Sequence, residues 1–217
     1  MKKKILSVVP FFAMVSCLNV GTLFSATPMT AFAAETSYTI TSWSALQDAI
    51  NAAPGDATTP ATETTNIKLT EDLTAPAGAS FISIPVGKDI TLDLQGHVLN
   101  GNSFGDTIIR NSGNLILNDS VPVTEHKGYI DADGLWHWDE NGAHQIVTGE
   151  SEKTITGGII TGGTGRNYSD GTNGGGVFNN GTITMTAGNI VGNKATTSGD
   201  GKVTGYGGGV YNYGTFT

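Results

Sequence analysis

An eleven-residue segment occurs twice near the C-terminal end of the sequence. Residues 174–184 read GGGVFNNGTIT and residues 207–217, which begin 33 positions later, read GGGVYNYGTFT, so that eight of eleven positions are identical. Repeats of this length, made of short apolar runs and turns, are typical of a solenoid, in which each unit buries its apolar side chains against the next. The repeat therefore restricts this part of the chain to a stack of similar coils.

The residues inside the repeat indicate strands. Runs of two to four residues are separated by glycine or asparagine, and no helical periodicity appears. In residues 182–185 the alternation sends Ile183 and Met185 to one side and the two threonines to the other. Short strands joined by tight turns stack in parallel, so we predict a parallel β-helix with this apolar pair inside. Asn179 and Asn212 are expected at equivalent corners, where side-chain amides stack from coil to coil.

Fainter copies of the pattern lie earlier in the sequence. Residues 111–117 match the segment that begins at Asn179, and residues 158–162 match residues 188–192. Short apolar runs that we predict as strands lie at residues 67–69, 81–86, 90–94, 107–109 and 115–117. The stack of coils is therefore expected to include much of the chain before the clear repeats.

The N-terminal segment has the pattern of an export signal. Three lysines at positions 2 to 4 precede an uncharged, mostly apolar run that ends near Ala31-Phe32-Ala33. This pattern predicts a signal peptide over residues 1–34, cleaved after Ala33 or Ala34. Prolines and polar residues interrupt the run, which disfavours a retained membrane anchor, and a lipidated Cys17 is a weaker alternative. We expect an extracellular protein that is secreted or attached to the cell surface.

The composition of the mature chain excludes several partners. Cys17 is the only cysteine, so that residues 35–217 have no disulfide and no thiolate ligand. All the acidic residues but only eight of the basic ones remain after cleavage, which gives a net charge of -11. This charge disfavours nucleic acid and anionic lipid as partners. We expect no membrane span in the mature chain.

Residues 35–80 are expected to form an N-terminal cap with one helix. Trp43, Leu46, Ile50 and Ala53 share one face of a predicted helix over residues 44–53, and Pro54-Gly55 ends the pattern. Ser44 and Gln47 have the spacing of a capping box. A helix at this place would cover the first coil, whose open strand edge would otherwise pair with other chains.

The repeats resemble the right-handed, pectin-lyase-like β-helices of bacterial surface proteins, especially those with repeats close to GGGVYN and GTFTM. Residues 90–97, ITLDLQGH, are similar to their opening coils. Residues 175–177 and 190–193 resemble paired motifs of polymorphic outer-membrane proteins, from which Gly176 and Ile190 depart. The resemblance covers residues 81–217. It implies an all-β fold, a right-handed parallel β-helix (solenoid) with a short N-terminal capping helix, and an adhesin-like role.

An enzyme that acts on polysaccharides is the main alternative, because many β-helices cleave acidic polysaccharides. Lyase chemistry needs carboxylates that hold Ca²⁺ and a nearby arginine or lysine, and hydrolysis needs paired acids. The mature chain contains only two arginines, Arg110 and Arg166, and neither lies in such a motif. We expect Asp93 to be a solvated residue on the outer face of a strand. We therefore favour a binding protein and assign no catalytic residue.

The most promising binding residues lie in residues 129–142, where the repeat is interrupted. If residues 135–139 are extended, Trp136 and Trp138 project from one face and His137 from the other, so that sugar rings could stack on the two indoles. The predicted carbohydrate-binding residues are Trp136, Trp138, Asp131, Asp139 and Asn141. In the alternative interpretation both tryptophans cover an apolar flank of the solenoid.

We expect glycans or other cell-surface polymers as partners, and no resident metal or cofactor. The histidines lack metal-ligand spacing, and the acidic run after Tyr129 departs from an EF-hand loop because Leu135 stands where a ligand is needed. A structural stalk is a third possibility. The last repeat stops within a strand at Thr217, so we expect the natural protein to continue with further repeats and a cap.

Overall fold

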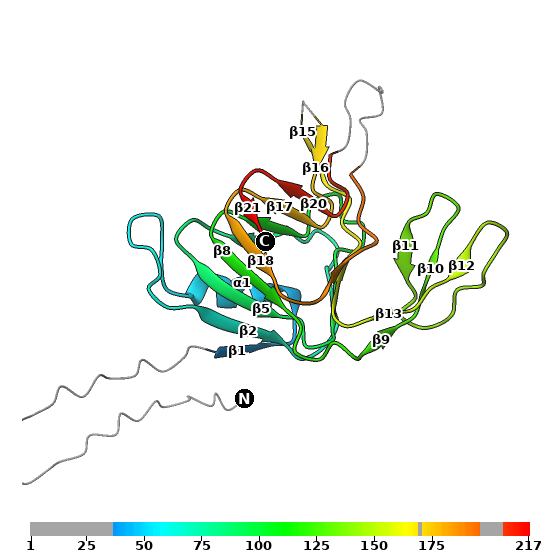
Figure 1. The fold of residues 1–217 in the computed structure, drawn as a ribbon, viewed down its shortest axis with the longest axis horizontal. Helices are drawn as coiled ribbons and strands as arrows, with labels where there is room; N and C mark the ends of the chain where they lie inside the picture. Colours follow the sequence, from blue (N-terminus) through cyan, green and yellow to red (C-terminus); the bar gives the residue numbers. More distant parts are fainter. Residues whose placement is uncertain (1–36, 169–170, 196–205) are drawn as a thin grey trace, which may run out of the picture. The chain divides into compact units, whose positions relative to one another are not determined.

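The computed structural model describes residues 37–168, 171–195 and 206–217. The predicted signal peptide, residues 1–34, lies outside the described residues. Within the described part, the chain forms a parallel β-solenoid of about six turns with one short helix (Figure 1). The predicted fold class is therefore confirmed.

Three parallel sheets run along the solenoid. The first sheet contains β1 (Ser37–Ile40), β2 (Thr65–Leu69), β5 (Asp89–Asp93), β8 (Asn114–Asn118), β18 (Thr182–Met185) and β21 (Thr215–Phe216). The second contains β3 (Leu73–Thr74), β6 (Val98–Asn100), β14 (Ile159–Thr161) and β19 (Asn189–Ile190). The third contains β4 (Ile82–Ile84), β7 (Ile109–Asn111), β17 (Val177–Asn179) and β20 (Val210–Asn212). Each full coil contributes one strand to each sheet in turn. Strands from residues 37–74, which we assigned to the cap, thus already belong to these sheets.

The strand register follows the sequence repeat. Thr182 pairs with Thr215 and Val177 pairs with Val210, each 33 residues apart. Inside β18 the side chain of Ile183 is 1% exposed and belongs to the core, whereas Thr182 is exposed. Met185 packs against the same core. The predicted inward direction of the apolar residues in this strand is confirmed.

A ladder of asparagines lies at one corner of the solenoid. Asn111 Nδ2 donates to Asn179 Oδ1 at 2.8 Å, and Asn179 Nδ2 donates to Asn212 Oδ1 at 2.6 Å. The parallel pairing of β7, β17 and β20 places the three residues one above another. The equivalence of Asn179 and Asn212 that we predicted is confirmed, and Asn111 extends the ladder by one coil.

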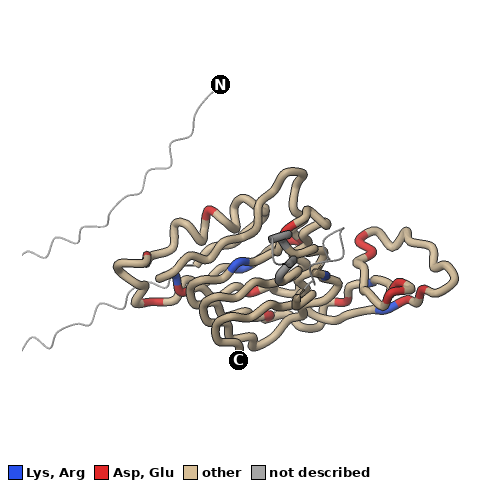
Figure 2. The backbone as a smooth tube through the Cα atoms, turned by 90° about the horizontal axis from the view of Figure 1, so that it is seen from above, with Lys and Arg blue, Asp and Glu red and all other residues tan. Residues whose placement is uncertain are grey.

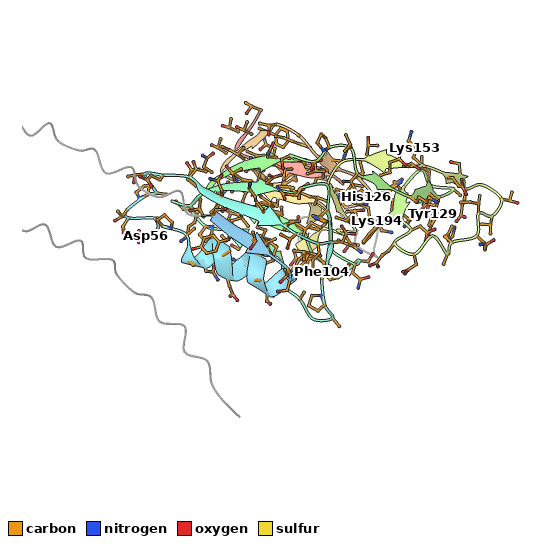
Figure 3. All side chains as sticks on the ribbon, turned by 90° about the horizontal axis from the view of Figure 1, so that it is seen from below. Asp56, Phe104, His126, Tyr129, Lys153 and Lys194 are labelled. Carbon is orange, nitrogen blue, oxygen red and sulfur yellow. The ribbon has the colours of Figure 1, made fainter. Side chains whose placement is uncertain are left out.

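The helix α1 (Trp43–Ala52) lies at the N-terminal end of the stack, beside β1 (Figure 3). The buried face is the predicted one, since Trp43, Leu46, Ile50 and Ala53 all belong to the core. The predicted N-cap residue of the helix is wrong. Ser42, not Ser44, is the N-cap residue, and its Oγ accepts from the backbone N–H of Ala45. The helix thus begins one residue earlier than predicted.

Gln47 links the helix to the third sheet instead of completing a capping box. Its Nε2 donates to the carbonyl oxygen of Ser83 in β4 at 3.1 Å, and its Oε1 accepts from the Ser83 N–H at 2.6 Å. This pair of bonds satisfies backbone groups at the open edge of β4, the first strand of its sheet. The helix therefore protects an exposed strand edge, as a cap requires.

The expectation for Asp93 is wrong. Its side chain is 5% exposed, and its Oδ1 accepts from the backbone N–H groups of Ser120 at 2.8 Å and Gln95 at 3.1 Å. Burial raises the pKa of Asp93, but the hydrogen bonds from Ser120 and Gln95 outweigh it and lower the pKa overall. Asp93 is the last residue of β5, where alternation no longer determines the direction of a side chain, so its carboxylate folds onto the turn.

Two antiparallel elements interrupt the coils. Between β8 and β14 the chain forms β9 (Glu125–His126), β10 (Gly128–Ile130), β11 (Trp136–Trp138), β12 (Ser151–Glu152) and β13 (Ile155–Thr156). We call residues 125–156 the insertion. Its stem is the β9–β13 pair, and its outer part is a sheet in which β10 is central (Figure 1). A smaller hairpin of β15 (Arg166–Tyr168) and β16 (Gly171–Asn173) precedes β17. Acidic residues are frequent along the insertion (Figure 2).

Candidate functional site

Trp136 anchors the insertion to the flank of the solenoid. Its side chain is 6% exposed and packs in a small apolar cluster with Val98 of β6 and Ile159 of β14. Its indole Nε1 donates to the carbonyl oxygen of Lys153 at 2.9 Å. The ring faces of Trp136 are therefore covered by protein, as in the alternative interpretation of the two tryptophans.

Trp138 lies on the same side of the insertion but is only partly buried. It packs at the edge of the same cluster and contacts His126 edge-on, with ring centroids 6.4 Å apart. Among the described residues no hydrogen bond involves its indole N–H. Of the two tryptophans, Trp138 is thus the one that a ligand can reach.

A stack of three rings lies on the other side of β10 and β11. Tyr129 is sandwiched between His144, at 3.6 Å between ring centroids, and His137, at 4.9 Å. Each imidazole also pairs with a carboxylate at 2.7 Å: His137 Nε2 with Asp131 Oδ2, and His144 Nε2 with Glu150 Oε2. The cross-strand register of Tyr129 and His137 produces this stack. The two pairs hold the loops of the insertion together.

The pKa values of these groups are shifted by their neighbours. The hydrogen bond with His137 is the main cause that lowers the pKa of Asp131, and the hydrogen bond with His144 does the same for the pKa of Glu150. Burial, with the neighbouring carboxylates, raises the pKa of Tyr129. Both carboxylates are therefore ionised at neutral pH, and the phenol of Tyr129 is neutral.

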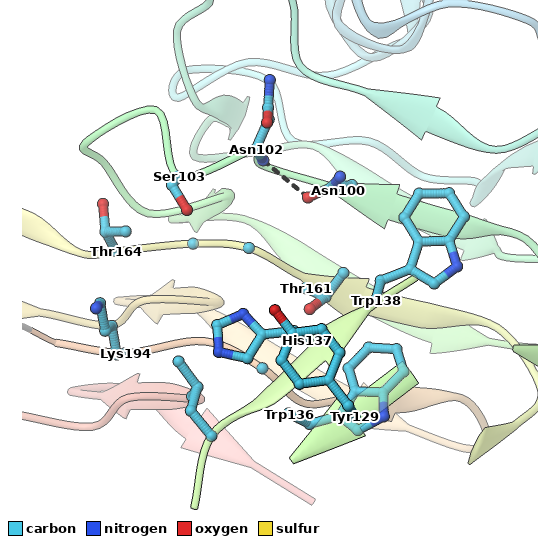
Figure 4. A pocket seen from close by; sticks show the side chains of 14 residues that line it. Asn100, Asn102, Ser103, Tyr129, Trp136, His137, Trp138, Thr161, Thr164 and Lys194 are labelled. Atoms are coloured by element: carbon cyan, nitrogen blue, oxygen red, sulfur yellow. Dashed lines mark hydrogen bonds between the residues drawn. The ribbon is translucent and has the colours of Figure 1, made fainter. Parts of the chain in front are cut away.

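A cleft of about 250 Å³ separates the insertion from the solenoid (Figure 4). One wall is aromatic and comes from the insertion, where the edge strand β11 contributes Trp136 and Trp138 from one face and His137, beside Tyr129 of β10, from the other. The opposite wall is polar and comes from the C-terminal ends of β6 and β14 and from the turns that follow β6, β14 and β19: Asn100, Asn102, Ser103, Thr161, Thr164 and Lys194. We call this space the insertion cleft.

Polar side chains of the insertion cleft lack protein partners. Within the described part of the chain, the hydroxyls of Ser103, Thr161 and Thr164, the amide of Asn102 and the ammonium of Lys194 make no hydrogen bond or ion pair. Thr161 is 3% exposed, and the Oγ1 of Thr164 is fully buried. Because buried polar groups are normally paired, these unpaired hydroxyls indicate a place where a ligand or water completes the bonding.

The turn after β6 has an unusual backbone. Asn102 and Ser103 have φ values of 50° and 55°, in the left-handed region that non-glycine residues seldom adopt. The N–H of Asn102 donates to Asn100 Oδ1 at 2.8 Å, and the N–H of Ser103 donates to the carbonyl oxygen of Gly162 at 2.8 Å. These bonds hold the polar rim of the cleft in one conformation.

The structure separates the predicted carbohydrate-binding residues. Trp138 lines the insertion cleft with an accessible ring, whereas Trp136 lines it as a buried support. Asp131 holds His137, and Asp139 lines a second cavity of about 170 Å³ with Tyr129 and His144. Asn141 is exposed and lines neither cavity.

Sequence reasoning missed the polar wall of the cleft. Thr161 is the last residue of β14 and Lys194 lies in the turn after β19, and they face the insertion because Trp136 attaches it to β6 and β14. A partial signal was the faint repeat at residues 158–162 and 188–192, which places both turns at one corner of the stack. The sequence contained no signal for the position of the insertion.

Around Arg110, the described residues do not include the group of carboxylates that a polysaccharide lyase needs to hold Ca²⁺. Arg110 lies over the ring of Phe81 at 4.1 Å and pairs with Asp106, and the side chain of Arg166 is outside the described residues. Among the described residues no group of three histidine, cysteine or carboxylate side chains is arranged around a common point for a metal ion. The described part also contains no helix with the length and hydropathy to span a membrane.

The fold and the cleft define a parallel β-solenoid protein with an inserted antiparallel element on one flank. Comparisons with models of protein families, with curated proteins and with solved structures found no match. The fold alone does not assign a function, so the residues of the insertion cleft are the structural basis for one.

Proposed function

We propose that the chain is an adhesin-like β-solenoid that binds a glycan in the insertion cleft. The observation that supports the proposal is the convergence of unpaired hydroxyl and amide groups opposite the accessible ring of Trp138. Sugars present apolar C–H faces that stack on aromatic rings and hydroxyls that need hydrogen-bond partners, so a cleft with one aromatic and one polar wall suits them. The cleft volume accommodates one or two sugar rings.

We further propose that the protein acts outside the cell. The lysines and the apolar run before Ala34 support export, as does the resemblance of the repeats to pectin-lyase-like surface proteins. The absence of cysteine after Cys17 means that folding does not depend on the redox state of the compartment. Terminal sequencing of the extracellular protein should give Ala34 or Glu35 as its first residue. Recovery of intact Met1 in the membrane fraction would contradict export.

A glycan array with the mature chain, residues 35–217, tests the binding function. We expect binding that Thr161→Val weakens by roughly tenfold, because the change removes one buried hydrogen-bonding group without changing the volume. Thr182→Val is the matched control, since Thr182 is an exposed strand residue away from the cleft. The absence of binding to any glycan would leave the structural stalk as the better explanation, and release of products from acidic polysaccharides would favour the enzyme.

A further inference from the structure

We infer that the insertion cleft selects a glycan with a single anionic group on an otherwise neutral sugar, and that Lys194 is the counter-ion. This inference rests on the proposed glycan-binding function and adds the class of ligand. It assigns a specific role to one residue that follows β19, on the solenoid side of the cleft. Lys194 and Tyr129, both labelled in Figure 3, line the cleft together, whereas Lys153 lies between β12 and β13 and does not line it.

The backbone holds Lys194 firmly in place. Its N–H donates to the carbonyl oxygen of Gly163 at 2.9 Å. The preceding residue, Asn193, is buried: its Oδ1 accepts from the Gly163 N–H at 2.9 Å, and its Nδ2 donates to the carbonyl oxygens of Ile160 and Val191. The turn that carries Lys194 is therefore fixed against the strand below, and its exposed side chain starts from the rim of the cleft.

No protein carboxylate neutralises this ammonium group within the described residues. Asp131, on the insertion, is held by His137 at 2.7 Å. Asp106, whose carbonyl oxygen accepts from the Thr164 N–H, pairs its carboxylate with Arg110 at 3.3 Å. Lys194 is thus a cation beside a cleft in an acidic protein. The carboxylates of Asp131 and Asp106 are already paired with His137 and Arg110.

The other polar groups of the cleft favour a ligand that accepts hydrogen bonds. Asn100 Oδ1 already accepts from the Asn102 N–H, whereas the Asn100 Nδ2 makes no hydrogen bond among the described residues and can donate to a ligand. Thr161 and Tyr129 add hydroxyl donors, and Lys194 adds three N–H donors. A sulfate, phosphate or carboxylate group accepts several bonds at once, and a charged acceptor forms the stronger ones.

The charge of the whole chain limits the ligand to one such group. The mature protein carries a net charge of -11, and acidic residues are frequent along the insertion (Figure 2). A polymer with a charge on every sugar would be repelled by this surface along its length. A ligand with a single anionic group can form an ion pair with Lys194, and its remaining uncharged sugars are not repelled by the acidic surface.

The test compares matched sugars on the mature chain. Lactose, sulfolactose and sialyllactose share a core and differ in their charge, and sulfolactose and sialyllactose distinguish a sulfate from a carboxylate. We expect at least one charged form to bind roughly tenfold more tightly than lactose. Lys194→Gln should abolish this difference in affinity, and Lys153→Gln, outside the cleft, should preserve it.

Three outcomes would overturn the role of Lys194 as the counter-ion. Equal affinities for lactose and both charged sugars in the native chain would overturn the role of Lys194 while the glycan-binding function stands. A charge preference that survives Lys194→Gln would also overturn it. Failure to bind any sugar of this set or of the array would contradict the inference and the proposed function together. Circular dichroism of the two variants verifies that both retain the fold, as expected for exposed lysines.

Discussion

The side-chain amide of Asn111 donates a hydrogen bond to Oδ1 of Asn179 at 2.8 Å, although the residues are 68 positions apart in the chain. Both side chains are fully buried. Each amide also bonds to the backbone of its own corner, since Asn111 Oδ1 accepts from the Gly113 N–H and Asn179 Oδ1 accepts from the Gly181 N–H. The ladder therefore fixes both the shape of the turn and the vertical register of the coils.

Removal of one amide from this ladder should destabilise the whole stack. Asn179→Ala removes one acceptor of the buried Asn111 amide and leaves the Gly181 N–H without its side-chain acceptor, so we expect a loss of about 1–3 kcal/mol in the free energy of unfolding. Asn180→Ala changes the exposed neighbour and should cost less than about 0.5 kcal/mol. Urea unfolding of both variants measures the difference. Similar losses would show that the ladder contributes little.

The alternation in β18 gives a second pair of matched variants. Ile183 is buried in the core and Thr182 is exposed, so that Ile183→Asp buries an unpaired carboxylate and Thr182→Asp places one in water. We expect Ile183→Asp to destabilise by several kcal/mol, on the order of 3 or more, and Thr182→Asp to have a mild effect. Thermal unfolding measures both. Equal shifts of the melting temperature would contradict the orientation of the strand.

The coils were predictable because their signal is local and repeated. A 33-residue period determines which residues are stacked, and polarity inside residues 182–185 determines which side chains face the core. The helix face was predictable for the same reason, since four apolar residues recur at helical spacing. The contacts of side chains at the ends of helices and strands were not predictable. Ser42 and Asp93 bond to backbone N–H groups at an element end and in a turn, and the periodicity of the sequence does not determine that local geometry.

The candidate site was only partly predictable. The indole pair in residues 136–138 stood out by composition, but periodicity does not tell which indole is covered when the insertion packs on the solenoid. The ring stack combines Tyr129 of β10, His137 of β11 and His144 from a loop of the insertion. The polar wall of the insertion cleft comes from three separate coils. Such sites arise from packing between elements that are distant in sequence, and a single sequence does not encode that packing as a pattern.

The two tryptophans should respond differently to truncation. Trp136→Ala removes the central side chain of the cluster that attaches the insertion, and we expect it to cost about 3–5 kcal/mol and to release the insertion. Trp138→Ala should keep the fold and weaken glycan binding by roughly tenfold, because it removes the accessible stacking surface. Near-ultraviolet circular dichroism and array binding of each variant test this division. Intact binding after Trp138→Ala would exclude Trp138 as the sugar platform.

The ring stack should depend on pH in a direction given by its carboxylates. The pKa of Asp131 is lowered from 3.8 and the pKa of Glu150 is lowered from 4.5, each chiefly by its histidine partner. A carboxyl group whose folded pKa is lowered stabilises the fold above its unfolded pKa, and that contribution is lost as the pH falls through the folded value. The stack should therefore remain intact from neutral pH down to the unfolded pKa values of 3.8 and 4.5, and it should come apart only as the pH falls below them.

Nuclear magnetic resonance of the imidazole protons follows this change locally. Stacking on Tyr129 shifts the protons of His137 and His144 by the ring current, and we expect both shifts to disappear together with the protonation of the carboxylates. Asp131→Asn should remove the shift of His137 at every pH and retain that of His144, because His144 keeps its own partner, Glu150. Glu150→Gln should do the reverse. Ring-current shifts that persist unchanged to pH 2, or that vanish for both histidines in each single variant, would show that the carboxylates do not hold the two rings independently.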